Sequence, residues 1–108
     1  MKRFLLGLAL SALVPAMAQA TTPAATVHMH NDAFAPLTIT VHTGDMVRWT
    51  NDDDDAHTVT ATDGSFDSKG IDSNGTWSHT FTKAGTYKYF CELHPFMKAA
   101  VVVKDASQ

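Results

Sequence analysis

Residues 85–104 read GTYKYFCELHPFMKAAVVVK and give the strongest indication of the fold. In the first half of this stretch, side chains of every second residue share a face, so that Tyr87, Tyr89 and Cys91 fall on one face of an extended chain. Such a period of two is typical of a half-buried β-strand. Its last part, from Ala99 to Lys104, is rich in valine and predicts a second strand. The stretch therefore predicts two strands that are joined by a short loop.

Shorter alternating stretches precede this pair of strands. They predict further strands at residues 27–30, 37–41, 46–50, 57–61 and 77–81. Glycine and aspartate mark the turns between them, and no stretch after residue 20 has the spacing of a long amphipathic helix. Seven or eight short strands with frequent turns predict an all-β fold, an antiparallel β-sandwich.

The first twenty residues have the order of a secretory signal peptide. A basic start, Met1-Lys2-Arg3, precedes an apolar run from Phe4 to Val14, and a small-residue cleavage motif ends at Ala20. The apolar run is shorter than a membrane-spanning helix requires. A buried first helix is the alternative, which the basic start and the cleavage motif together disfavour. We expect a signal peptide over residues 1–20, cleaved after Ala20, and one domain over residues 21–108.

The charge balance excludes some partners. Lys and Arg total 8 and Asp and Glu total 11, so the whole chain has a formal net charge of −3. Lys2 and Arg3 belong to the predicted signal, so residues 21–108 carry 6 basic and 11 acidic residues and a net charge of −5. Without a basic patch, nucleic acid is not an expected partner. No second apolar span follows, so we expect no membrane insertion, and we expect a monomer.

The sequence contains one cysteine, Cys91, which cannot form an intramolecular disulfide. In an exported chain a lone thiol has three explanations: an intermolecular disulfide, burial as a small apolar residue, or metal binding. The neighbours favour metal binding, because Cys91, His94 and Met97 recur at intervals of three residues in one loop between strands. The alternative is a β-turn in which the sulfur atoms are incidental.

A thiolate, an imidazole and a thioether form a soft donor set, which favours copper over hard cations. Zinc accepts Cys and His, but Met is not among its usual ligands. Two histidines and a cysteine in a trigonal arrangement, with a weak axial methionine, are typical of a blue-copper site. The loop supplies only His94. His57 is the best candidate for the second histidine, because it opens a predicted strand directly after an acidic loop.

Several stretches of the chain carry a family resemblance. They are Met29-His30-Asn31, Gly44 to Asn51, His57-Thr58-Val59, Gly85 to Cys91 and His94 to Met97. In these stretches the chain resembles the cupredoxins, and most of all their amicyanin and plastocyanin branch. The short spacing of the cysteine, histidine and methionine in the last loop is similar to that of amicyanins.

The resemblance implies a fold, a cofactor and a function. The fold would be a Greek-key β-sandwich of the cupredoxin type, and the cofactor one type 1 copper ion that cycles between Cu(I) and Cu(II). The implied ligands are His57, Cys91, His94 and Met97. The implied function is non-enzymatic one-electron transfer in the periplasm, with redox partners such as a c-type cytochrome, an amine dehydrogenase or a copper reductase.

The chain departs from the amicyanin pattern at two places. The residue after the first ligand histidine is Thr58, where amicyanins usually have an asparagine that braces the cysteine loop. The hydroxyl of Thr58 can make the same kind of bond. Between Cys91 and His94 stands Glu92-Leu93, which brings a negative charge close to the predicted metal.

Two other functions remain open. A copper-handling protein, either a chaperone or a resistance factor, would use exposed and exchangeable sites, and His28 and His30 offer such a pair on one predicted strand face. A copper enzyme would need an open coordination position and further copper centres, for which no residues stand out. The acidic run Asp52 to Asp55 is interpreted as a solvated loop, and the alternative is steering of a cationic partner.

Overall fold

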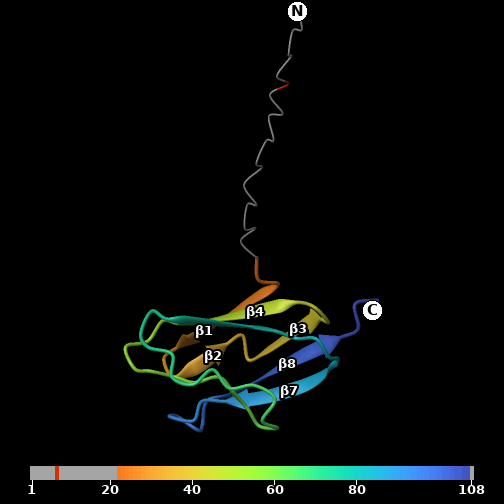
Figure 1. Cartoon of the computed structure of the whole chain (residues 1–108). Coiled ribbons are helices and arrows are strands. Elements are labelled where there is room, and N and C mark those ends of the chain that lie inside the picture. Colours follow the sequence, from red (N-terminus) through yellow and green to blue (C-terminus); the bar gives the residue numbers. More distant parts are fainter. Residues whose placement is uncertain (1–6, 8–21, 108) are drawn as a thin grey trace, which may run out of the picture.

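The computed structural model describes Gly7 and residues 22–107, which form two four-stranded β-sheets (Figure 1). The predicted signal peptide lies outside the described residues, apart from Gly7. In the described part of the chain no helix is present that could span a membrane. The strands are β1 (Ala25–His30), β2 (Ala33–Ala35), β3 (Thr38–His42), β4 (Met46–Asn51), β5 (Thr60–Ala61), β6 (Thr76–Thr80), β7 (Gly85–Phe90) and β8 (Lys98–Lys104).

The predicted β-sandwich is confirmed, but its sheets are mixed and not antiparallel throughout. One sheet has the strand order β2-β1-β4-β6 and the other β3-β8-β7-β5. β1 pairs with β4 in parallel, and so does β3 with β8. The chain crosses from one sheet to the other at every connection from β2 through to β7, so strands that are remote in sequence become neighbours. An alternating pattern shows which face of a strand is buried and says nothing about the direction of its neighbour.

The core lies between the sheets, and Trp49 on β4 meets Tyr89 on β7 inside it. Neither residue has more than 1% of its surface exposed. Their rings meet edge to face with centroids 5.6 Å apart, and the Trp49 indole N–H donates to the Tyr89 hydroxyl oxygen at 3.2 Å. Burial of each side chain of this size stabilises the fold by about 2 to 3 kcal/mol. This pair therefore ties β4 to β7, the strand that ends beside Cys91.

The expected strand over residues 57–61 forms only in part, because β5 covers just its last two residues. Before β5 the backbone donates to side chains. The N–H of Thr58 donates to Cys91 Sγ at 3.3 Å, and that of Val59 donates to Ser68 Oγ at 2.7 Å. These bonds replace a strand ladder and turn the segment towards the loop that follows β7.

Burial raises the pKa of the Tyr89 phenol from its ordinary value of 10.0 to about 12, and the hydrogen bond from Trp49 opposes this only in part. The folded protein therefore keeps this proton at pH values where the unfolded chain loses it. Stability from this group is complete below pH 10 and is lost as the pH rises towards 12. We predict a fall of about 2 to 3 kcal/mol in the free energy of unfolding over that interval.

Urea unfolding between pH 10 and pH 12, followed by tryptophan fluorescence, measures this fall. The variant Tyr89→Phe has no phenol to titrate and should lack this part of the loss. An equal loss in both proteins would contradict the prediction.

Candidate metal centre

The predicted ligand loop folds back tightly between β7 and β8. Cys91 directly follows β7, and Met97 directly precedes β8. Three backbone hydrogen bonds close the loop. The N–H of Cys91 donates to Met97 O at 3.1 Å, that of Met97 donates to His94 O at 2.8 Å, and that of His94 donates to Cys91 O at 3.3 Å. The loop therefore gathers its three sulfur and nitrogen side chains at one end of the sandwich.

His57 reaches the same end from a different part of the chain, the connection between β4 and β5. Its backbone forms two hydrogen bonds with Ile71, 3.1 and 2.7 Å long, which hold the segment in place. The side chains of His57 and Cys91 are fully buried, whereas His94 keeps 22% of its side chain exposed. The structure thus brings the isolated histidine next to the loop.

Three donor atoms converge at this point. His57 Nδ1 and His94 Nδ1 are 3.1 Å apart, and Cys91 Sγ is 3.7 Å from each of them. A triangle with these sides has one point in its plane that lies about 2.0 Å from all three corners. This distance equals a typical metal–nitrogen bond and is slightly shorter than a metal–sulfur bond. A single cation therefore fits between the three atoms with little rearrangement.

The protonation of His57 is also compatible with a bound cation. His57 Nε2 lies 2.9 Å from Asp53 Oδ2, and a carboxylate only accepts hydrogen bonds, so Nε2 carries the proton and Nδ1 a lone pair. Cys91 Sγ accepts the backbone N–H of Thr58. His57 Nδ1 therefore offers its lone pair towards Cys91 Sγ and His94 Nδ1. Two imidazoles and a thiolate are donors that favour a soft cation.

Met97, the predicted axial ligand, lies at the base of the loop. Only 2% of its surface is exposed, and it belongs to the core cluster. Its backbone bonds to Cys91 and His94 hold it beside the donor triangle. Because a thioether is a soft donor and not a usual zinc ligand, its position favours copper.

The histidine pair on β1 stands apart from this centre. His28 Nδ1 is 2.7 Å from Asp52 Oδ2, and His30 Nδ1 is 3.7 Å from Asp53 Oδ1. Among the residues that the structure describes, neither histidine belongs to a group of three converging donors. The pair therefore lacks the third donor that a firm metal site needs.

Thr58 braces the Cys91 loop with its hydroxyl group. The Thr58 Oγ1 atom accepts the backbone N–H of Glu92 at 2.8 Å. It lies 2.9 Å from Thr60 Oγ1, and Thr60 donates to Asp67 Oδ1 at 3.3 Å. Since a carboxylate only accepts hydrogen bonds, each donor in this series faces an acceptor one step closer to Asp67, starting from the N–H of Glu92. The structure thus shows the loop braced by a hydroxyl in place of an amide.

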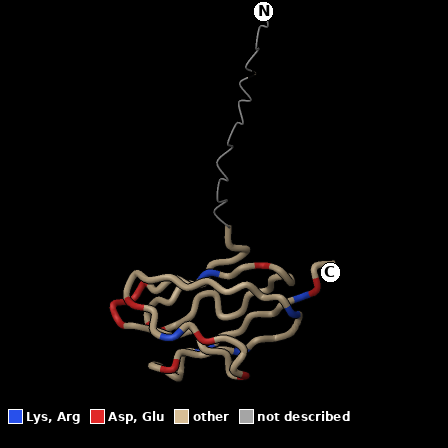
Figure 2. The backbone as a smooth tube through the Cα atoms, in the orientation of Figure 1, with Lys and Arg blue, Asp and Glu red and all other residues tan. Residues whose placement is uncertain are grey.

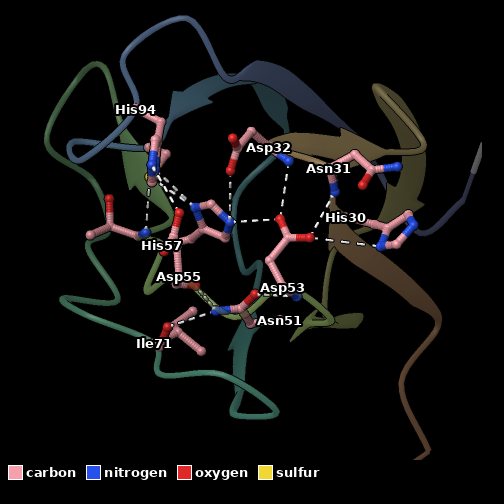
Figure 3. A network of polar contacts seen from close by, with 11 residues as sticks. His30, Asn31, Asp32, Asn51, Asp53, Asp55, His57, Ile71 and His94 are labelled. Atoms are coloured by element: carbon pink, nitrogen blue, oxygen red, sulfur yellow. Dashed lines mark hydrogen bonds and ion pairs between the residues drawn. The ribbon is translucent and has the colours of Figure 1, made fainter.

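The acidic run from Asp52 to Asp55 is divided between solvent and site. Asp53 has 14% of its side chain exposed, against 42% for Asp52 and 73% for Asp55. Partial burial opposes the ionisation of Asp53, but hydrogen bonds from the Asp32 backbone N–H and the His57 imidazole outweigh it and hold the pKa of Asp53 below its usual value. The interpretation as a solvated loop is therefore wrong for Asp53, whose contacts are drawn in Figure 3.

The end of the molecule that carries the centre is acidic, as Figure 2 shows for the loop at residues 52–55. Asp55 Oδ2 lies 4.0 Å from His94 Nε2, at the exposed edge of that imidazole. Asp32 adds a second carboxylate within reach of the same imidazole. The surface around the one partly exposed donor side chain is therefore negatively charged.

Comparison with known proteins agrees with this geometry. The sequence matches the family of the cupredoxin-like domain over residues 3–103. The chain belongs to the cupredoxin family. It is 32% identical to amicyanin of Paracoccus versutus over 95 residues. The aligned region covers 82% of this chain and 72% of that protein. It is 37% identical over 76 residues to amicyanin-alpha of Methylorubrum extorquens, which covers 66% of this chain and 64%, just under two thirds, of that protein.

A solved structure gives the same relationship for this cupredoxin. A reduced Cu(I) form of an amicyanin variant at pH 4 superposes with a TM-score of 0.71 at 32% identity, over 81% of this chain and 88% of that chain. The predicted resemblance to the amicyanins is confirmed. Copper is therefore the cofactor that the donor set and the family together indicate.

The brace at Thr58 gives a prediction about stability. Thr58→Val removes the hydroxyl and leaves the Glu92 N–H and the Thr60 hydroxyl short of a partner, so the free energy of unfolding should fall by about 1 to 3 kcal/mol. Thr58→Ser keeps the hydroxyl and should lose less. Urea unfolding of the metal-free proteins measures both effects. A Thr58→Val protein as stable as the parent would show that the brace contributes nothing.

Proposed function

We propose that this cupredoxin is a periplasmic electron carrier that passes single electrons through a type 1 copper site, with a signal peptide over residues 1–20. The proposed ligands are His57, Cys91, His94 and Met97. The observation that carries the proposal is the triangle of His57 Nδ1, His94 Nδ1 and Cys91 Sγ, which offers one central point to a metal.

Bound copper would supply the one-electron couple between Cu(I) and Cu(II). The residues of the chain supply a frame that suits both states. Cys91 and His57 are buried, and their backbones are tied to Met97 and Ile71 by hydrogen bonds. A packed frame of this kind resists rearrangement towards the preferred geometry of either oxidation state, which favours fast electron transfer.

His94 is the residue through which we expect electrons to enter and leave. It is the only one of the four proposed ligands with appreciable exposure, 22% of its side chain. Leu93 and Phe96 in the same loop are 56% and 68% exposed. A small apolar surface beside an exposed ligand suits the brief contacts that redox partners make. We propose partners such as a c-type cytochrome, an amine dehydrogenase or a copper reductase, and a monomeric carrier that is not itself an enzyme.

A copper titration of the reduced, metal-free protein tests the proposal. We expect an intense blue thiolate-to-copper absorption band and an EPR spectrum with a narrow copper hyperfine splitting, both saturating at one copper per chain. Cys91→Ser should abolish the blue band, because the band needs the thiolate. The double variant His28→Gln and His30→Gln is the matched control and should keep it.

Colourless binding would overturn the proposal if it survived Cys91→Ser and disappeared in the double variant of His28 and His30. That outcome would instead indicate a copper-handling protein that uses the exposed pair on β1.

A further inference from the structure

A single carboxylate, that of Asp53, joins His57 to the turn between β1 and β2 (Figure 3). Asp53 Oδ2 lies 2.9 Å from His57 Nε2 and accepts the backbone N–H of Asp32 at 3.0 Å. Asp53 Oδ1 accepts the backbone N–H of Asn31 at 2.7 Å. Both oxygens are therefore engaged, and every contact comes from outside the acidic run.

The β1–β2 turn is shaped to meet this carboxylate. Asn31 and Asp32 have backbone φ angles of 53° and 56°, in the left-handed region. Two successive residues in this conformation form a tight hairpin turn, and here both of their N–H groups point at Asp53. The turn costs conformational energy that the two short hydrogen bonds offset.

Asp53 is also fixed from its own backbone. Its N–H donates to the side-chain oxygen of Asn51 at 2.9 Å, and Asn51 is fully buried. The Asn51 amide group donates to the backbone oxygens of Asp55 and Ile71 at 2.8 and 3.0 Å. Because Ile71 is paired with His57, the carboxylate and the imidazole are held in one network.

The proton positions in this network decide which nitrogen of His57 is open to a metal. An ionised carboxylate has no proton to donate, so His57 Nε2 must carry the hydrogen of its bond to Asp53. The neutral ring has one proton, and Nδ1 is left with a lone pair that faces Cys91 and His94. The next carboxylate oxygen, Asp32 Oδ1, lies 3.6 Å from Nε2, too far for a hydrogen bond, so without Asp53 either ring nitrogen could carry the proton.

We propose that Asp53 is a positioning residue for the copper site: its carboxylate holds His57 in the Nε2–H form before any metal arrives and raises the basicity of Nδ1 towards the metal. This inference rests on the proposed function, in which His57 is a ligand. A more basic imidazole stabilises Cu(II) more than Cu(I), so Asp53 also lowers the reduction potential of the site.

The test compares Asp53→Asn with Asp54→Asn. Each variant removes one negative charge from the same loop, but Asp54 is exposed and has none of the contacts of Asp53. Asparagine at position 53 has one acceptor and one NH₂ group, so it cannot accept from Asn31, Asp32 and His57 together. Asp53→Glu keeps the carboxylate and serves as the rescue variant.

The first readout needs no copper. Nitrogen-15 NMR of the histidine rings in the metal-free protein reports which ring nitrogen of His57 is protonated. We expect the Nε2–H form in the parent, in Asp54→Asn and in Asp53→Glu, and a mixture of forms in Asp53→Asn. An Nδ1–H form in the metal-free parent would overturn the inference at once, even if Asp53→Asn did not fold.

The second readout uses the copper-loaded proteins. We expect Asp53→Asn to bind Cu(II) about 10- to 100-fold more weakly in competition with a chelator, the range found when a partner of a metal ligand is removed. The reduction potential of Asp53→Asn should rise further than that of Asp54→Asn. The affinity and the potential of Asp53→Glu should lie closer to those of the parent. Equal potentials and affinities in Asp53→Asn and Asp54→Asn would overturn the inference. Failure of the proposed function is distinguishable, because it would remove the blue band from the parent protein itself.

Discussion

Two hydrogen bonds between Thr58 and the loop after β7 hold the metal centre together. The backbone N–H of Thr58 donates to Cys91 Sγ, and the Thr58 hydroxyl accepts the N–H of Glu92. They join segments that lie more than thirty positions apart in the sequence and that enter the site from different connections. Because His57 precedes Thr58 directly, these bonds set the distance between the buried imidazole and the thiol. The donor triangle depends on this junction.

The sandwich supplies the stiffness that the junction needs. β7 delivers Cys91 from the core, where Tyr89 packs against Trp49, and the loop returns at once into β8. On the other side the backbone of Ile71 is hydrogen-bonded to that of His57, and the buried amide of Asn51 donates to the backbone oxygen of Ile71. Packed interiors of this density do not deform continuously, so a ligand held at several points stays where the fold puts it.

Much of the fold and of the site could be predicted from local patterns. The alternation of Tyr87, Tyr89 and Cys91 identified β7, and the spacing of Cys91, His94 and Met97 identified the loop. Parallel pairing could not be predicted, because side-chain alternation carries no strand direction. The strand expected over residues 57–61 shrank to β5 because its N–H groups bond side chains from remote segments, which no local pattern contains.

The role of Asp53 could not be predicted from the sequence pattern. A run of four aspartates is indistinguishable from a solvated loop, and three of its members fit that description. The only local signal was the spacing of four residues between Asp53 and His57, which brings a carboxylate within reach of a following histidine. The contacts that single out Asp53 come from Asn31 and Asp32, on a turn more than twenty positions upstream.

The folded chain, and not the metal, sets the positions of the donor atoms. Crystal structures of the metal-free, Cu(I) and Cu(II) proteins at neutral pH test it most directly. We expect the separations of 3.1 Å between the two Nδ1 atoms and 3.7 Å from each to Cys91 Sγ to be the same in all three structures within coordinate error. A metal-free structure in which His57 has turned away from Cys91, or in which the loop after β7 has opened, would contradict it.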